Sequence, residues 1–440
     1  MSHVSTTASA IEQNLGGPLD PASLAVFRIM LGVLLTVAPL GIIASGGIAS
    51  LYDPAFPPFP YPHLDALRPL SLAAIVLVHL GLSALGIAIV LGLGARVALG
   101  LTAGVLAWLL LLDQAAYLNH DVLLVMLCVE LALSPCDHVL SLDRRWRSPP
   151  PPARAHGLWM LRISIVLVYV FAGLAKLNPD WLSGQPLGMW LDARQDWPGV
   201  GPWLAWAPTA MAMSAAGLVL DLLVAPALLS KRLRMGAILA LSAFHVVNGV
   251  LFRIGIFPLV MLAAHLLFLD PGWPRRVLRW APHAPVRGAA PSRAIVAGTA
   301  LWIGVQVVVP LRHLAYPGRP SWTEEGHRFA WRMMLRTKRG TLGFRAVDLT
   351  SGDSTEVDVR AMLSDRQRLT IIGQPDMIWL LAQRLRTDAE AEGHTIAVYV
   401  DHRVSLNGRP PAPLIDPTVD LSRQPRHAWT HAPWILPLPD

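Results

Sequence analysis

The chain has 440 residues, of which 53% are hydrophobic and only 15% charged, and its mean hydropathy is positive. This composition excludes an ordinary soluble protein of the same length and favours a protein that spans a lipid bilayer. The formal net charge of +7 does not indicate nucleic-acid binding, because the basic residues form short clusters between apolar runs, where they set membrane topology. The two cysteines, Cys128 and Cys136, lie in one apolar run, which excludes a disulfide framework and a zinc-binding CxxC pair.

Nine apolar runs approach the length that a membrane crossing needs, which is about 20 residues. They cover residues 22–45, 70–93, 97–116, 121–138, 157–177, 204–229, 235–252, 254–269 and 294–311. Because the seventh and eighth runs are short, we predict a mostly α-helical bundle of eight or nine transmembrane helices. No basic segment precedes the first run and no small-residue cleavage site follows it, so we expect it to remain as a transmembrane helix.

Three clusters of basic residues predict the orientation of this bundle. They are Arg144, Arg145, Arg147 and Arg154 after the fourth run, Lys231, Arg232 and Arg234 after the sixth, and Arg275, Arg276, Arg279, Arg287 and Arg293 after the eighth. Positively charged loops stay in the cytoplasm. We therefore expect an integral membrane protein, in the cytoplasmic membrane if its source is bacterial, with a cytoplasmic N-terminus. Nine crossings then place the C-terminus outside.

Beyond residue 311 the sequence becomes polar, with charges every few residues. A turn signal at 351–353 separates two strand-like runs, residues 375–386 form an amphipathic helix pattern, and residues 395–400 resemble a strand. These patterns predict a small extracytoplasmic α+β domain. The predicted organisation is a short cytoplasmic segment at 1–18, a transmembrane domain at 19–315 and the outer domain at 316–440.

Polar side chains collect near the outer ends of several runs, and ionisable groups at membrane depth are usually functional. They are Asn119 and His120 at the start of the fourth run, Lys176 at the end of the fifth, His245 and Asn248 in the seventh, and His313 after the ninth. Each alone would be a snorkelling lysine or a histidine with one interhelical hydrogen bond. Because Gly173 and Gly249 lie beside them and permit close helix contact, we predict a shared polar cavity.

Lys176 is the candidate general base of this cavity. Loss of water at the edge of an apolar cavity disfavours the ammonium form of a lysine, so its amine can accept a proton. A base beside a lipid-accessible pocket favours a lipophilic substrate with an acidic hydroxyl, such as a hydroquinone.

A second polar level is predicted to be structural. Arg28, Arg162 and Asp221 fall in the inner halves of their helices, and a buried carboxylate needs a cationic partner, so we expect an ion pair there. The sequence has no HExxH, GxSxG or paired-acid motif, which disfavours metal and serine hydrolase chemistry.

Ten segments resemble the vitamin K-dependent gamma-carboxylase family and the related bacterial membrane domain called HTTM. In the membrane part they are LDPASLAVFR (19–28), LNH (118–120), YVFAGLAKLNPDW (169–181), FHVVN (244–248) and IGIFP (254–258). In the outer part they are PLRH (310–313), WTEEGHRFAWRMMLR (322–336), VSLNGR (404–409), IDPTVDL (415–421) and WILPL (434–438). The segments follow the order of the family, so the resemblance covers nearly the whole chain.

This resemblance implies a coupled reaction. Reduced vitamin K, as phylloquinol or menaquinol, is oxygenated by O2 to its epoxide while CO2 is added to glutamate, which gives γ-carboxyglutamate. Lys176 would deprotonate the hydroquinone, Asn119 would hydrogen-bond a quinone oxygen, and His120 would handle protons around the glutamate carbanion.

The resemblance also implies a pocket for the naphthoquinone and the glutamate side chain, and it implies no metal. The residues that would line this pocket are His245, Asn248, His313, His327, Trp331, Met333 and Met334. Arg368 would hold a substrate carboxylate through a bidentate contact. The implied partner is a glutamate-containing protein or peptide. Because the chain ends soon after the WILPL segment, without the long outer extension with which animal members recognise a propeptide, the identity of this partner is left open.

Three alternatives remain at this point. The chain could be an epoxidase that does not carboxylate, a non-catalytic transporter or assembly factor that reuses the fold, or a quinone-binding sensor, because a fold does not fix a function. A transporter usually has inverted repeats or broken midplane helices around its site, and the sequence indicates neither.

Overall fold

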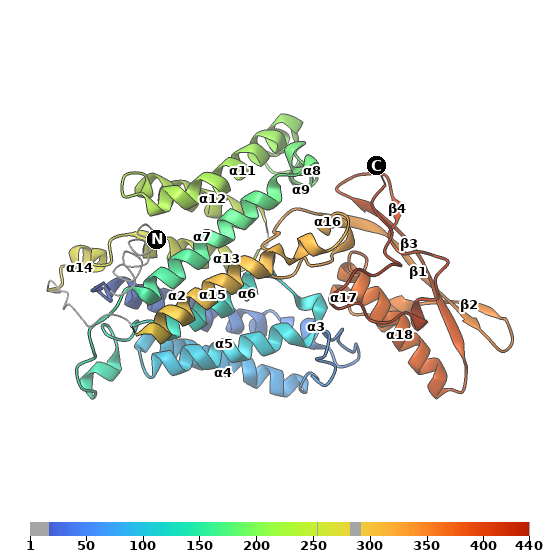
Figure 1. The fold of residues 1–440 in the computed structure, drawn as a ribbon, viewed down its shortest axis with the longest axis horizontal. Helices are drawn as coiled ribbons and strands as arrows, with labels where there is room; N and C mark the ends of the chain where they lie inside the picture. The colour runs from blue at the N-terminus through green and yellow to red at the C-terminus, as the bar shows by residue number, and fades with distance from the viewer. Residues whose placement is uncertain (1–16, 253, 282–291, 440) are drawn as a thin grey trace, which may run out of the picture.

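The structure, a computed structural model, describes residues 17–252, 254–281 and 292–439. A bundle of long helices occupies one part of the molecule, and a sheet with its own helices lies at one end of the bundle (Figure 1). The prediction of a mostly helical membrane body with a small α+β domain is therefore confirmed. Most of the predicted N-terminal segment, and Arg287 in the third basic cluster, lie outside the described residues.

All nine predicted runs contain a helix. Seven of the described helices are long and apolar enough to cross a membrane: α2 (Ala22–Ala44), α4 (Leu72–Leu91), α5 (Ala95–Leu112), α7 (His156–Lys176), α11 (Ala207–Leu229), α12 (Arg234–Leu251) and α15 (Arg293–Leu311). The other two runs form shorter helices, α6 (Asn119–Ala132) and α13 (Phe257–His265), the latter continued by the single turn η3 (Leu266–Phe268). The fourth run was predicted too long, since residues 133–137 form turns.

The outer surface of the bundle is apolar. Leu77 of α4, Val97 of α5 and Leu301 of α15 are 67%, 68% and 70% exposed. Side chains of this kind on several helices are unfavourable in water and match the hydrocarbon core of a bilayer. The chain is thus an integral membrane protein.

Helix α15 is attached to the bundle by a buried carboxyl group. Glu130 of α6 accepts hydrogen bonds at Oε1 from Trp302 Nε1 at 2.7 Å and Gln306 Nε2 at 3.2 Å, both on α15, and from the Ser164 hydroxyl on α7. Buried polar groups are stable only when they are hydrogen-bonded, so these contacts fix α15 against α6 and α7.

The basic clusters lie at the end of the bundle opposite the sheet. The connection between α6 and α7, the connection between α11 and α12, and helix α14 (Trp273–Leu278) all lie at the left in Figure 1, whereas the strands lie at the right. Helix α7 runs from left to right, so Lys176, its last residue, lies at the end that faces the outer domain.

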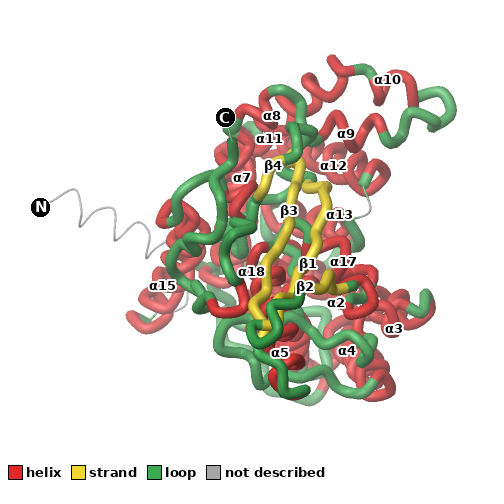
Figure 2. Tube along the Cα trace, turned by 90° about the vertical axis from the view of Figure 1, so that its right-hand side faces the viewer, coloured by secondary structure: helices red, strands yellow, loops and turns green. Residues whose placement is uncertain are grey.

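The outer domain is a four-stranded antiparallel sheet in the order β2-β1-β3-β4. Its strands are β1 (Lys338–Asp348), β2 (Ser354–Val357), β3 (Ile396–Leu406) and β4 (Ala412–Pro413). Phe344 of β1 pairs with Val400 of β3, and both are buried in a core with Ile378 and Leu381 of α18 (Pro375–Ala391). Seen from its end, the molecule presents the strands in front of the membrane helices (Figure 2).

Two sets of polar contacts hold the outer domain on the membrane body. Gln367 of α17 (Asp365–Ile371) donates through Nε2 to Asp113 Oδ2, at 3.1 Å. The second set is formed by Asp180, which accepts a hydrogen bond from Asn407 Nδ2 at 2.9 Å and forms an ion pair with Arg409. Asn407 belongs to the tight turn between β3 and β4, where Gly408 has a φ of +83°, a conformation that glycine adopts without strain. This turn thus places two side chains on the membrane body just beyond Lys176.

Candidate functional site

A cavity of about 570 Å³ lies where the membrane body meets the outer domain. Its walls come from α6, α7, α11, α12 and α13 and from the loop before β1. Most of the lining is apolar, with Leu220, Phe257 and Met261 among the contributing side chains. The cavity brings together eight of the predicted site residues: Asn119, His120, Lys176, His245, Asn248, His327, Met333 and Met334.

Lys176 forms an ion pair with Asp221 of α11, through Nζ and Oδ2. The two side chains are only 8% and 3% exposed, and the ammonium group also lies 5.2 Å from the centre of the Trp181 ring. The close approach of α7 and α11 depends on Gly173, because a Cβ atom there would be 2.9 Å from Leu222 Cδ2. Asp221 was expected to pair with an arginine at a deeper level, and this expectation is wrong.

The two arginines bind main-chain carbonyl groups instead of a carboxylate. Arg162 donates from Nε to Leu267 O at 2.8 Å and from Nη2 to Leu269 O at 3.0 Å, and Arg28 donates from Nη2 to Leu140 O. Leu267 and Leu269 lie at the end of a helical segment, where carbonyl groups without intrahelical partners carry partial negative charge. Carbonyl groups thus take the place of the expected carboxylate, with two hydrogen bonds to Arg162 and one to Arg28.

A tyrosine links two histidines beside the cavity. The Tyr169 hydroxyl lies 2.7 Å from His245 Nε2 and 2.8 Å from His265 Nε2, and all three side chains are buried. Tyr169 and His265 were not predicted as site residues. Tyr169 lies seven residues before Lys176, which is two helical turns, so helical spacing places both on one face of α7. His265 stands alone in the eighth run and gave no comparable signal.

Asn119 is held in place by a residue that also contacts the outer domain. The Tyr117 hydroxyl lies 2.8 Å from Asn119 Oδ1, and it accepts a hydrogen bond from the Phe329 main-chain N–H at 2.6 Å. Since the oxygen of the Asn119 amide is engaged, its NH2 group is left as a donor. His120, the next residue, packs its ring 5.6 Å from that of Phe257.

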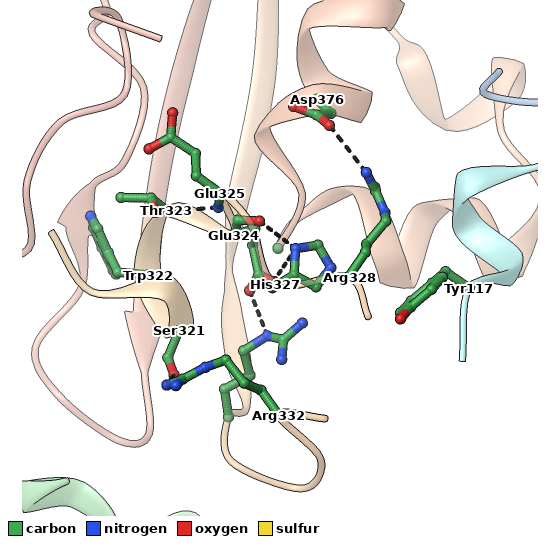
Figure 3. Close-up of polar contacts among 12 residues, drawn as sticks. Tyr117, Ser321, Trp322, Thr323, Glu324, Glu325, His327, Arg328, Arg332 and Asp376 are labelled. Atoms are coloured by element: carbon green, nitrogen blue, oxygen red, sulfur yellow. Dashed lines mark hydrogen bonds and ion pairs between the residues drawn. The ribbon is translucent and has the colours of Figure 1, made fainter. Parts of the chain in front are cut away.

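A charged cluster around Glu324 lies next to the outer wall of the cavity, to which it contributes His327 and Arg336 (Figure 3). The Glu324 carboxylate forms ion pairs with Arg336 Nε at 2.6 Å and Lys338 Nζ at 2.8 Å, and lies 3.5 Å from His327 Nδ1. Although burial raises the pKa of Glu324, the two cations outweigh burial and lower it to about 2. Burial lowers the pKa of His327 to about 3 and that of Lys338 to about 8. Glu324 is therefore ionised at neutral pH and His327 is uncharged.

A glycine sets the position of this wall. Gly326 has a φ of +66°, and a Cβ atom there would be 2.6 Å from the Cα atom of His313. The loop therefore packs directly on the segment that follows α15, which a larger residue would prevent.

Three predicted site residues do not line the cavity, contrary to the prediction. The His313 ring is turned to its own segment, with Nδ1 2.7 Å from Pro310 O, and Trp331 is buried in the hydrophobic core of the membrane body. Arg368 forms an ion pair with Asp365, three residues earlier on α17, and its side chain is 43% exposed. Sequence order alone could not show that α17 lies away from the cavity.

The comparisons with known proteins agree with this geometry. Residues 17–273, more than half of the chain, match the family model of the HTTM domain. Residues 291–440 match the model described as "Vitamin K-dependent gamma-carboxylase, lumenal domain". No solved structure matches the chain. With both domains matched in order, and with the cavity lying where they meet, the chain belongs to the vitamin K-dependent gamma-carboxylase family.

Proposed function

We propose that this protein is a membrane-embedded carboxylase that couples the oxygenation of reduced vitamin K to the carboxylation of glutamate side chains. The observation that carries the proposal is the Lys176–Asp221 pair on the wall of an apolar cavity that both domains line. Such a pair provides acid–base chemistry in a place that a lipophilic molecule can occupy. Family membership supports the vitamin K dependence and a glutamate-containing substrate.

The residues of the cavity fit a reduced naphthoquinone. Its volume falls in the range of about 300–1,000 Å³ that small-molecule sites usually have, and it combines mostly apolar walls with a few polar groups. When bound, reduced vitamin K supplies the electrons for oxygenation and the base strength that removal of a glutamate γ-proton requires. Phe257, Met261 and Met333 would hold its ring, and the Asn119 NH2 group would donate to a ring oxygen.

Asp221 allows Lys176 to act as a base without adding net charge to the membrane. In the ion pair the proton is on Nζ of Lys176. Transfer of that proton to Oδ2 of Asp221 leaves a neutral amine on the cavity wall, which can accept a proton from an acidic hydroxyl. Both arrangements of the pair are neutral overall, so the low dielectric of the site does not oppose the exchange. The pair therefore prepares the base before a ligand binds.

We further infer that the end of the bundle with the basic clusters faces the cytoplasm. Lysine and arginine are retained on the cytoplasmic side of membrane proteins, and three such clusters gather at the end opposite the outer domain (Figure 1). The outer domain would then lie outside the cytoplasm and present a protein or peptide substrate to the cavity.

The test is a reconstituted assay with reduced vitamin K, O2, labelled bicarbonate and glutamate peptides. The expected result is vitamin K epoxide together with label fixed in the peptide. Lys176→Ala should abolish both products, measured per amount of folded protein because the change also leaves Asp221 without its counter-ion. Lys231→Ala, which removes an exposed lysine at the opposite end of the bundle, should leave both unchanged. Epoxide without fixed label would show that the protein is an epoxidase that does not carboxylate. The absence of both products would contradict the proposal.

A further inference from the structure

The outer wall of the cavity carries more positive than negative charge. Arg332 and Arg336 line this wall. Glu324, which does not line the cavity itself, pairs with Arg336 and with Lys338. His327 is uncharged at neutral pH. The cluster therefore has one carboxylate for three cations, and Arg332 is attracted by the Glu324 charge without forming an ion pair with it.

Arg332 lines the cavity, and no carboxylate lies within ion-pairing distance of it among the described residues. Its one side-chain hydrogen bond in that part of the chain runs from Nη2 to the Ser321 hydroxyl, at 3.3 Å. Figure 3 shows this side chain lying beside Ser321. Burial lowers the pKa of Arg332 to about 10, the Arg336 charge acts in the same direction, and the Glu324 charge opposes them only in part. A half-buried guanidinium group without an ion pair of its own is unfavourable, and an anion in the cavity would relieve this.

The geometry of an arginine selects the kind of anion. The planar guanidinium group has parallel N–H donors that match the two oxygens of a carboxylate. Arg336 lines the same cavity and uses Nε for Glu324, so its terminal nitrogens can add a second set of donors. Arg368, which sequence reasoning had assigned to this role, is engaged by Asp365 away from the cavity.

We infer that Arg332, supported by Arg336, binds the side-chain carboxylate of the substrate glutamate and the dicarboxylate of the product. This inference rests on the proposed function. It orients the substrate: the carboxylate lies on the outer wall, against the guanidinium groups, while the Lys176–Asp221 pair lies on the wall formed by the membrane helices. The glutamate side chain thus enters from the outer domain and a lipophilic cofactor from the membrane side. Arg332 is a substrate-binding residue, distinct from the base.

The first test measures steady-state carboxylation by the full-length protein with a glutamate peptide. Arg332→Gln should raise KM for the peptide roughly 10- to 100-fold, the range expected for the loss of a charged hydrogen bond, and should leave KM for reduced vitamin K unchanged. Arg332→Lys keeps the charge without the paired donors and should show a smaller increase. Arg339→Gln removes an exposed arginine of the same domain and is the matched control, with KM expected to be that of the wild type.

The second test needs no turnover and uses malonate, which carries the two carboxylates of the product side chain. At constant ionic strength, malonate should raise the Tm of the wild type and of Arg339→Gln saturably, and should not raise that of Arg332→Gln. If that variant does not fold, Arg332→Lys should show a weakened shift. The inference would be overturned if the protein carboxylates but malonate raises the Tm of all variants equally and KM for the peptide is unchanged in Arg332→Gln. Malonate binding that depends on Arg332 in a protein that carboxylates nothing would instead count against the proposed function alone.

Discussion

The buried ion pair between Lys176 and Asp221 predicts a strong energetic coupling between two helices. Because both side chains are less than one-tenth exposed, solvent does not screen the pair. Asp221→Asn leaves an ammonium group without its counter-ion, and Lys176→Met leaves a carboxylate without its counter-ion. Each single change should cost about 3–5 kcal/mol of the free energy of unfolding.

The double variant should be far more stable than the sum of the single changes indicates. With Asn at 221 and Met at 176, no unpaired charge remains, and replacing a buried ion pair by neutral groups of similar volume is often close to neutral. We expect the double variant to lie within about 1 kcal/mol of the wild type, so the coupling energy approaches the sum of the two single losses, about 5–9 kcal/mol.

The assay is thermal unfolding of the four proteins in the same detergent. At ~2 °C for each kcal/mol, the single variants should lose about 6–10 °C in Tm and the double variant ~2 °C or less. Arg276→Gln is the control, because Arg276 and Asp270 form an exposed pair with side chains 66% and 61% exposed, which is worth less than ~1 kcal/mol. Losses in the double variant that equal the sum of the two single losses would refute the coupling. The double variant should also be inactive although it is stable, which separates the chemistry of Lys176 from its structural role.

Further predictions concern three other contacts. Tyr169→Phe removes the hydroxyl that joins two buried histidines, and we expect a loss of about 1–3 kcal/mol in unfolding free energy together with reduced turnover, measured against the partly exposed Tyr399→Phe as control. Asp180→Asn breaks the ion pair with Arg409 beyond the cavity, and proteolysis should then separate the outer domain from the membrane body sooner; an unchanged cleavage rate would argue against a docking role. Burial lowers the pKa of His402 to about 4 from its ordinary value of 6.5. The unfolded chain therefore binds a proton first as pH falls, and stability should drop by up to about 1.4 kcal/mol per pH unit between about pH 6.5 and 4, a slope in Tm that His402→Gln should flatten.

The sequence predicted the membrane part well because hydrophobic run length is a direct physical requirement of the bilayer. The same runs gave the depth of Lys176 and of His245, and both line the cavity. The partner of Asp221 was missed because depth was read from the ends of the runs, whereas the contact depends on how α7 and α11 pack at Gly173. Side-chain pairing between helices is a property of packing and leaves no periodic signal.

The outer wall of the cavity was predictable only in part. His327, Met333 and Met334 were singled out by resemblance, and the structure places them at the cavity. Arg332 lies in the same segment, but a single arginine in a polar loop is usually solvated, and its lack of a carboxylate partner is visible only in three dimensions. Nothing in the sequence indicated that Glu324 would be buried and paired with both Arg336 and Lys338.

The hydrogen bond between the Tyr117 hydroxyl and the Phe329 main-chain N–H determines which changes the loop around residue 329 can tolerate. Since the donor is a backbone group, any residue except proline can supply it. The hydrogen bond itself therefore does not depend on the side chain at 329. That side chain is restricted for other reasons, because Phe329 has a φ of +58° and its ring lies 6.0 Å from that of Tyr117. Position 117 has to reach both the amide oxygen and the backbone with one hydroxyl, so relatives should vary less at 117 than at 329.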